Sequence, residues 1–396
     1  MKFSIATNWQ EDLIPKIKRE GVIELYGKLA NDFVGGGRSP LLLPNPSKRD
    51  VRLHIQEAHK NGLRFNYLLN ALCLDNREFT ISGQRKICKL LDWLTDLSVD
   101  TVTVSIPYLL QLIRKQYPHF KVCVSVLAGV NTPEKAKYWE DLGADSITLP
   151  SIDVVRDFSI LRAIRKRVNC ELQLIANNGC LLNCPFSKYH GLIVSHASQS
   201  MHKKQGFEFY YCLINCRFLK LKEPINFLRS DWIRPEDIRY YEEVGIDRIK
   251  LTERTASTEL ISKVVNAYTD RYYYGNLADI LPSLSQKSII SKSKRTIIIN
   301  SLKYLFHPLS VNIFKLLKLI RAISPIDVYI DNQELEGFLE HFLDKSCKEK
   351  SCQECGYCEG VAKRAIKIDE DYRNRIVAQY KELLDELVSS KMFKYI

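Results

Sequence analysis

The chain has 396 residues, 45% of them hydrophobic, and a formal net charge of +12 at pH 7. This size and apolar content suffice for a sizeable core and predict one large domain with a smaller one. The first residues lack the apolar run of a signal peptide, and lysines and a proline interrupt the most apolar stretch, 304–323. Neither a secretion signal nor a membrane span is therefore expected, and we predict a cytoplasmic protein.

Short apolar runs alternate with amphipathic stretches over the first 270 residues. A strand followed by a helix, repeated, predicts a parallel sheet, and eight repeats favour an α/β fold closed into a TIM-like barrel. A doubly wound sheet is the alternative, but no glycine-rich phosphate turn follows the first run. The expected strands are Phe3–Thr7, Val22–Tyr26, Leu63–Leu69, Thr101–Ser105, Lys121–Leu127, Ser146–Leu149, Glu171–Ala176 and Asp247–Leu251. The expected helices include Val51–Lys60, Gln84–Leu97, Pro133–Leu142, Val154–Val168 and Pro235–Val244.

Polar residues stand at the ends of the expected strands, where a barrel of this class carries its active site. The substrate-binding candidates at these ends are Tyr26, Asn70 and Asn177. Arg38 joins them from the loop Gly35-Gly36-Gly37-Arg38. One interpretation makes this loop approach a ligand while Arg38 binds an anion; a plain tight turn is favoured over it.

The connection 177–234 is much longer than the others, and long ordered loops in compact domains usually carry function. It holds two cysteine pairs with the same gap, namely Cys180, Cys184, Cys212 and Cys216. In a reducing compartment four thiolates suit a 4Fe–4S cluster or a zinc ion, and the position at the barrel mouth favours a reactive cluster. A radical S-adenosylmethionine motif would need its third cysteine at Ser187, so that interpretation is set aside.

Histidines supply further candidates for acid–base chemistry. His190, His196 and His202 share the long loop, and His190 leads because it lies nearest to Cys184. His54 and His59 are five residues apart on one expected helix, the wrong interval for a zinc pair. We expect those two to form a surface pair.

The long loop and the segments after it resemble the collagenase-like peptidases of family U32. The most specific stretches are WIRPEDIRYYEEVGIDRIKLTERTASTELISKVVNAY at Trp232–Tyr268 and YYYGNL at Tyr272–Leu277. The early ELYGKL, with GGGR after it, is also similar to the family's first barrel units. The resemblance covers about the first 280 residues.

Several members of that family are oxygen-independent hydroxylases that hold a 4Fe–4S cluster on four cysteines. The resemblance implies such a cluster on Cys180, Cys184, Cys212 and Cys216, although the first gap is shorter here than in the hydroxylases. It implies an iron–sulfur-dependent oxidoreductase acting, without dioxygen, on a small or carrier-tethered organic substrate. The alternatives are a peptidase, as the family name says, and an RNA-modifying protein.

A Lys–Arg segment carries the expected catalytic groups. The family usually reads Lys-Ile-Glu-Gly-Arg there, whereas this chain reads Lys250-Leu251-Thr252-Glu253-Arg254, with the acid displaced by one position. On a strand that displacement turns the side chain to the other face. We expect Lys250 and Arg254 to fix an anionic group, while His190 or Glu253 moves protons.

A second cysteine cluster stands near the C-terminus, in CKEKSCQECGYC. Its members are Cys347, Cys352, Cys355 and Cys358. The last three have the two-residue gaps of ferredoxin-type ligation, which favours a second 4Fe–4S cluster that exchanges electrons with a carrier protein. Zinc is the alternative, because four-cysteine zinc sites use similar spacings.

The expected organisation is a barrel at 1–279, a basic amphipathic connection at 280–330 and the cysteine-containing region at 331–396. Within the connection, 280–326 contains no acidic residue while lysines and arginines alternate with apolar residues. Such a segment is typical of contact with a membrane surface or an acidic partner such as RNA, and a helix packed on the barrel is equally favoured.

Overall fold

The computed structural model describes residues 1–40, 43–203, 205–206, 208, 210–281, 284, 319, 322, 325–347 and 350–391. Nearly all of the basic segment 280–326 lies outside these residues, so its contact with a membrane or RNA stays a prediction. Among the described helices, none has the length and apolar character needed to cross a membrane.

Eight parallel strands close into one barrel in chain order, which confirms the TIM-like prediction. β1 pairs with both β2 and β8, and the pairing of Ser4 with Lys250 lies at the closing seam. Every expected strand is present, with ends shifted by no more than three residues. The strands are β1 Lys2–Ala6, β2 Val22–Gly27, β3 Arg64–Leu69, β4 Thr101–Val104, β5 Lys121–Val124, β6 Ser146–Thr148, β7 Glu171–Ile175 and β8 Arg248–Leu251.

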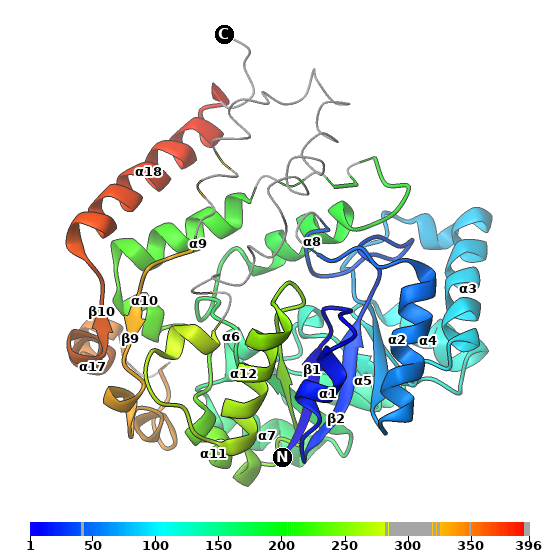
Figure 1. Ribbon diagram of the computed structural model, residues 1–396, viewed down its shortest axis with the longest axis horizontal. Coiled ribbons are helices and arrows are strands. Elements are labelled where there is room, and N and C mark those ends of the chain that lie inside the picture. The colour runs from blue at the N-terminus through cyan, green and yellow to red at the C-terminus, as the bar shows by residue number, and fades with distance from the viewer. Residues whose placement is uncertain are drawn as a thin grey trace.

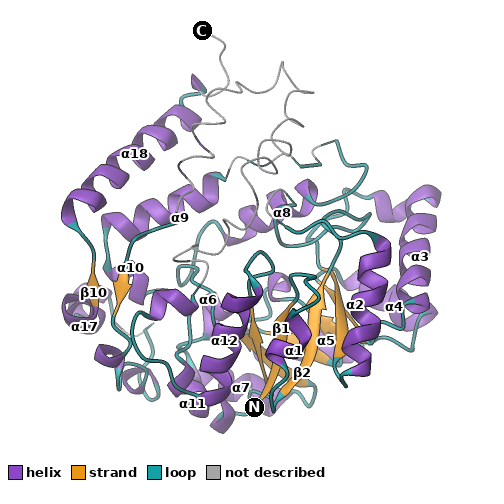
Figure 2. Ribbon diagram, in the orientation of Figure 1, coloured by secondary structure: helices purple, strands orange, loops and turns teal. Residues whose placement is uncertain are grey.

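Amphipathic helices surround the barrel and bury their apolar faces on it (Figure 2). They are α1 Leu13–Ile17, α2 Lys48–Lys60, α3 Ile81–Asp96, α4 Pro107–Gln116, α5 Pro133–Asp141, α6 Ser151–Val154, α7 Phe158–Arg167, α11 Ile238–Glu243 and α12 Thr258–Asp270. The single helix expected at 154–168 is two, because the chain leaves α6 at Val155 and begins α7 at an Asp157 cap. The helix expected from Pro235 begins as the 3-10 turn Pro235–Asp237.

The barrel interior is polar at its centre. The carboxylate of Glu24 accepts hydrogen bonds from Ser4 (2.7 Å) and Asn66 (3.3 Å) and pairs with Arg248 at 3.3 Å. Thr103 continues the chain of hydrogen bonds by donating to Asn66 at 2.7 Å. A buried carboxylate is tolerated only when it is paired in this way. The network fixes one register for the strands beneath the mouth.

The long connection after β7 folds into α8 Ser187–Ala197, α9 Tyr211–Lys222 and α10 Ile225–Leu228. In Figure 1, α8 lies over the upper end of the barrel. Ser195 of α8 accepts a hydrogen bond from the backbone of Leu72, and Gln199 donates to the carbonyls of Val34 and Cys73. The loop therefore covers the C-terminal ends of β2 and β3.

The C-terminal region packs on this same loop. α18 Glu370–Val388 runs beside α9, and α17 Tyr357–Ala365 lies against α10 (Figure 1). β9 Tyr329–Ile330 and β10 Ile366–Lys367 form a small antiparallel sheet. Asn332 joins the region to the barrel by accepting from Arg234 (2.9 Å) and donating to Glu236 (2.9 Å).

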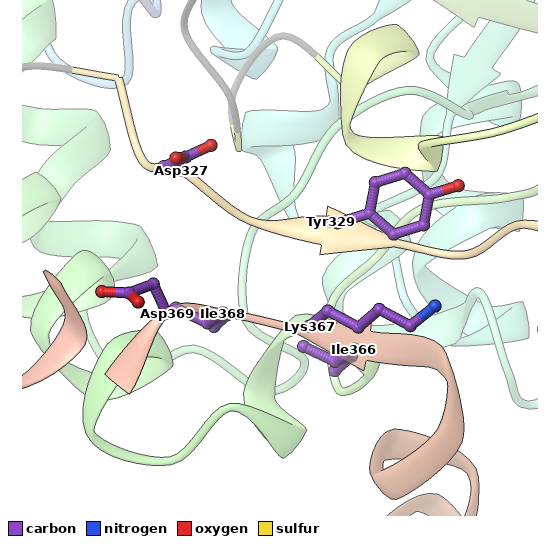
Figure 3. A pocket seen from close by; sticks show the side chains of 6 residues that line it. All are labelled: Asp327, Tyr329, Ile366, Lys367, Ile368 and Asp369. Atoms are coloured by element: carbon purple, nitrogen blue, oxygen red, sulfur yellow. The ribbon is translucent and has the colours of Figure 1, made fainter. Parts of the chain in front are cut away.

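A shallow hollow lies on this small sheet. Its lining consists of Asp327, Tyr329, Ile366, Lys367, Ile368 and Asp369. Figure 3 shows the two carboxylates at one end and the Lys367 and Tyr329 side chains at the other. Half of the lining side chains are exposed charged groups, and none of the lining residues belongs to the barrel strands or the long loop.

The expected surface pair of histidines is wrong for His54. Its side chain is 7% exposed on the inner face of α2, and its Nε2 lies 2.7 Å from the hydroxyl of Thr7. Burial lowers the pKa of His54 to about 4. His59 is half-buried and pairs with Asp100 at 2.9 Å. Position 54 belongs to the buried apolar face of α2. A neutral imidazole fits on this face because Thr7 is its hydrogen-bond partner.

The buried His54 should make the protein acid-sensitive. The unfolded chain binds a proton near pH 6.5 and the folded chain near pH 4, so stability falls as pH decreases between these values. From pH 7 to pH 5 this group alone should remove about 2 kcal/mol from the free energy of unfolding. We expect His54→Asn to lack that part of the loss in urea unfolding at the two pH values. An unchanged pH dependence would contradict the assignment.

Candidate functional site

The barrel mouth gathers predicted catalytic and substrate-binding residues from several strand ends. Tyr26 lies in β2, Lys250 in β8, and Glu253 and Arg254 directly after β8. Arg38 reaches over from the glycine loop, and Tyr26, Glu253 and Arg254 are among its electrostatic neighbours. The C-terminal strand ends therefore meet as the sequence predicted.

Lys250 is a buried amine over an aromatic ring. Its Nζ stands 3.8 Å from the centroid of the Tyr26 ring, a cation–π arrangement. Burial, which disfavours the charged form, lowers the pKa of Lys250 to about 8. The Tyr26 hydroxyl donates to the Leu251 carbonyl at 3.0 Å, and this bond fixes the ring beneath the amine. Lys250 can thus exchange a proton close to neutral pH.

Arg38 and Glu253 form an ion pair across the mouth, with Nη1 and Oε2 3.6 Å apart. The carboxylate also accepts from the Thr255 hydroxyl at 2.5 Å. Arg38 and these hydrogen bonds outweigh desolvation and lower the pKa of Glu253. Glu253 is therefore an ionised partner of Arg38 near neutral pH.

The backbone of Glu253 has φ +116°, a region that glycine adopts easily and other residues rarely do. The family's usual segment has its glycine at this position. Glu253 therefore has the backbone conformation of a glycine, although it carries a side chain with a carboxylate. Such conformations cost of order 1–3 kcal/mol and cluster at functional sites.

Asn70 and Asn177 hold the frame of the mouth. Asn177 accepts from the Thr252 backbone N–H at 2.6 Å and donates to its carbonyl at 3.0 Å, which joins the ends of β7 and β8. Asn70 accepts from the Gly37 N–H (3.3 Å) and donates to Ser125 (3.1 Å). A Cβ at Gly36 would stand 2.8 Å from the Asn70 side-chain oxygen. The glycine loop is thus packed onto Asn70 by close approach, and it presents Arg38.

His190 and Glu208 extend the site into the long loop. Burial and the nearby Arg38 lower the pKa of His190 to about 4, so its imidazole is neutral at pH 7. Glu208, which the sequence did not single out, is 4% exposed, and burial raises its pKa to about 7. Ser39 donates a hydrogen bond to Glu208, and Arg38 is its cationic neighbour. The aromatic residues around Glu208 in GFEFYY were the available signal for a buried acid.

Positive charge exceeds what the acids at the mouth compensate. Lys28 pairs with Asp32 at 3.0 Å and Arg38 pairs with Glu253. Arg254 is 6% exposed, and its Nη1 has no hydrogen-bond partner within the described part of the chain. Burial and Arg38 lower the pKa of Arg254 to about 10. A buried guanidinium with an open donor is suited to an anionic or carbonyl oxygen of a ligand.

The four cysteines of the long loop lie close enough to interact electrostatically with one another. Cys180 interacts with Cys184 and Cys216, and Cys212 interacts with Cys184 and Cys216. All four are free thiols, and burial raises the pKa of Cys212 to about 12. Buried Lys220 is their nearby cation, and it forms no ion pair with a carboxylate among the described residues. Within the same residues, no three His, Cys, Asp or Glu side chains stand at coordinating distance.

The positive φ of Glu253 predicts that glycine at this position stabilises the fold more than alanine does, the reverse of the usual order. Glu253→Gly and Glu253→Ala both remove the ion pair with Arg38, but only glycine adopts φ +116° without strain. We expect the glycine variant to be more stable than the alanine variant by about 1 kcal/mol in denaturant unfolding. At exposed Glu57 within α2 the order should reverse, by about 1 kcal/mol. The same order at both positions would contradict the observed backbone.

Comparison with known proteins supplies the family. The family model described as Peptidase family U32 matches residues 44–279. A Methanocaldococcus jannaschii protein described as the uncharacterized protease MJ1657 is 30% identical over 353 residues, covering 89% of this chain and 91% of that protein. Because 353 residues exceed the length of the barrel, this similarity extends into the C-terminal region.

Solved structures add similarities too weak to carry an argument. The U32 peptidase Mk0906 matches with a TM-score of 0.49 and 24% identity, covering 64% of this chain and 93% of that one. FabK from Thermotoga maritima matches with a TM-score of 0.30 and 10% identity, covering 66% and 64%. The fold assignment rests on the closed barrel itself.

These matches correct the expected activity. The sequence favoured an iron–sulfur-dependent oxidoreductase over a peptidase, and that preference is wrong: the family model and the full-length relative both carry peptidase descriptions. The cysteine pattern predicted a metal site, and it does not distinguish an oxidoreductase from a peptidase. The chain belongs to peptidase family U32, a family of enzymes.

Proposed function

We propose that this chain is a peptidase that hydrolyses peptide bonds at the mouth of its barrel. The similarity to the M. jannaschii protease over 89% of this chain carries the proposal. The mouth supplies suitable chemistry, because it combines a carboxyl group that titrates near pH 7 with several buried cations. Peptide hydrolysis needs a base for water, a donor to the oxyanion and an acid for the leaving amine.

Glu208 is the proposed general base. Its pKa of about 7 matches the proton-transfer task at neutral pH, and its side chain is buried within the loop that covers the mouth. In its ionised form it takes a proton from water as the water attacks the peptide carbonyl. The neighbouring Arg38 favours this ionised form, and Ser39 orients the carboxylate.

Arg254 and Lys250 are the proposed groups for the developing charges. Arg254 has an open N–H donor in a buried setting, where a hydrogen bond to an oxyanion is stronger than in water. Lys250, with its pKa of about 8, is protonated at pH 7 and can give its proton to the leaving amine. His190, neutral at this pH, is assigned no proton-transfer role and is proposed to line the substrate site with Arg38.

The cysteines of the long loop are proposed to bind a metal, as an iron–sulfur cluster or zinc. The donor set fits, because the four thiols are electrostatic neighbours of one another and buried Lys220 is a cation beside Cys180 and Cys184. A bound metal would supply a rigid cross-link between the start of the loop and α9. The peptidase steps assigned above use only the chain's own side chains.

The proton-transfer role of Glu208 predicts a large rate effect. In Glu208→Gln the volume is kept and the base is removed, so cleavage of a peptide library, followed by mass spectrometry, should slow by about 10²–10⁴-fold. Glu223→Gln, an exposed change in the same loop, should leave the rate unchanged. Equal rates for Glu208→Gln and the parent protein would remove Glu208 from the mechanism.

The pH dependence follows from the same two groups. Deprotonation of Glu208 should raise kcat/KM through pH 7, and deprotonation of Lys250 should lower it above pH 8. Lys250→Arg keeps the charge with a much higher pKa, so the fall above pH 8 should disappear even if the overall rate is lower. An alkaline limb that persists in this variant would assign the acid role to another residue.

A further inference from the structure

Arg156, between α6 and α7, is a buried cation that lies among aromatic rings. It is 5% exposed, and its guanidinium lies over the rings of Trp232 (5.0 Å), Phe338 (4.9 Å) and Phe342 (5.4 Å). Its Nη2 donates to the Ser230 carbonyl at 3.0 Å. Within the described residues it makes no ion pair, which is costly for a buried charge.

Two cysteines of the C-terminal region lie beside Arg156. Its electrostatic neighbours are Cys358, Cys347, Tyr241 and Asp231. Tyr357, directly before Cys358, stacks on Phe338, one of the rings that Arg156 lies over. The Tyr241 hydroxyl already donates to the Val155 carbonyl at 2.8 Å and is uncharged. The carboxylate of Asp231 is held by Asn178 and by the Cys180 N–H, on the side of the long loop. Cys358 and Cys347 therefore lie beside a guanidinium that has no ion pair among the described residues, where thiolates bound to a metal would supply negative charge.

The backbone brings the other two cysteines of this cluster to the same place. Cys352 and Cys355 begin and end the short helix α16, whose N-terminus is fixed by a capping box of Ser351 and Glu354. Gly356 then turns the chain with φ +61°, so that Cys358 falls in the first turn of α17. Cys352 and Cys355 are both neighbours of Cys358 and of Cys347, and all four are free thiols.

Four thiolates on one metal centre would supply the negative charge that compensates the buried guanidinium of Arg156. Both a zinc ion and an oxidised 4Fe–4S cluster with four thiolates carry a net charge of about −2, which a nearby guanidinium stabilises. Arg229 is a second cationic neighbour of Cys358. The exposed side chains of Cys352 and Cys355 can rotate onto an ion, which the described sulfurs do not yet surround at coordinating distance.

We propose that the C-terminal region contains a four-thiolate metal centre whose charge Arg156 compensates. Its ligands are Cys347, Cys352, Cys355 and Cys358. Because Arg156 belongs to the barrel and α17 packs on α10, the centre fastens the C-terminal region to the barrel. This site is separate from the peptidase mouth and does not depend on the activity proposed there.

Metal analysis of the full-length protein, purified without oxygen, tests the ligands. Cys355→Ser should lose about one zinc or about four irons with their sulfide per chain, relative to the parent protein. Loss of zinc identifies a zinc site and loss of iron with sulfide identifies a cluster; either outcome supports a thiolate centre. Cys88→Ser, a half-buried cysteine of α3, should lose nothing. Equal metal content in Cys355→Ser and the parent protein would overturn the proposal.

A variant that keeps every ligand tests the charge argument even if Cys355→Ser fails to fold. Arg156→Met should speed loss of the metal to a chelator by about 10-fold, because the anionic centre loses its buried counter-charge. Arg156→Lys should restore part of the retention, and Arg167→Met, an exposed arginine of α7, should change nothing. Parent-like retention in Arg156→Met would overturn the proposed role of Arg156.

Discussion

Compensation of buried positive charge is the constraint on which this molecule depends. Arg248 at the barrel centre has Glu24 as its partner, at 3.3 Å. Lys250, two residues further along β8, lies over the ring of Tyr26 and makes no ion pair among the described residues, and burial lowers its pKa to about 8. Arg254 keeps an open donor. Arg248, which has a carboxylate partner inside the barrel, is therefore structural, whereas Lys250 and Arg254 are available for a ligand.

Barrel closure explains why the cations meet. The seam between β1 and β8 brings residues separated by more than 240 positions into register, and the hydrogen-bonded pairs of Asn177 fix the ends of β7 and β8. The long loop then adds Glu208 from above and places the C-terminal region beside it through α9 and α10. A single insertion after β7 thus serves both the mouth and the attachment of the tail.

The sequence predicted the barrel well because each strand was a short apolar run with a turn signal on either side. It also predicted the meeting of Tyr26, Lys250, Glu253 and Arg254, since strand ends share one face, whereas for the loop of Arg38 it favoured a plain turn. Burial was harder to predict: His54 looked exposed, and Glu208 was one acid in a long loop. The positive φ of Glu253 depends on the direction in which the chain leaves β8, and the residues around position 253 did not predict that direction. The expected activity failed because cysteine spacing indicates metal chemistry without naming the reaction.

The most direct test of the peptidase assignment is hydrolysis in water enriched in oxygen-18. Peptides incubated with the full-length protein should yield fragments whose new C-terminal carboxylates each carry one oxygen-18 atom, since the attacking oxygen comes from solvent. Mass spectrometry of the fragments measures this directly, and Glu208→Gln serves as the control for a contaminating protease. Cleavage that is equal in the control, or no cleavage of any peptide, would contradict hydrolysis at the barrel mouth.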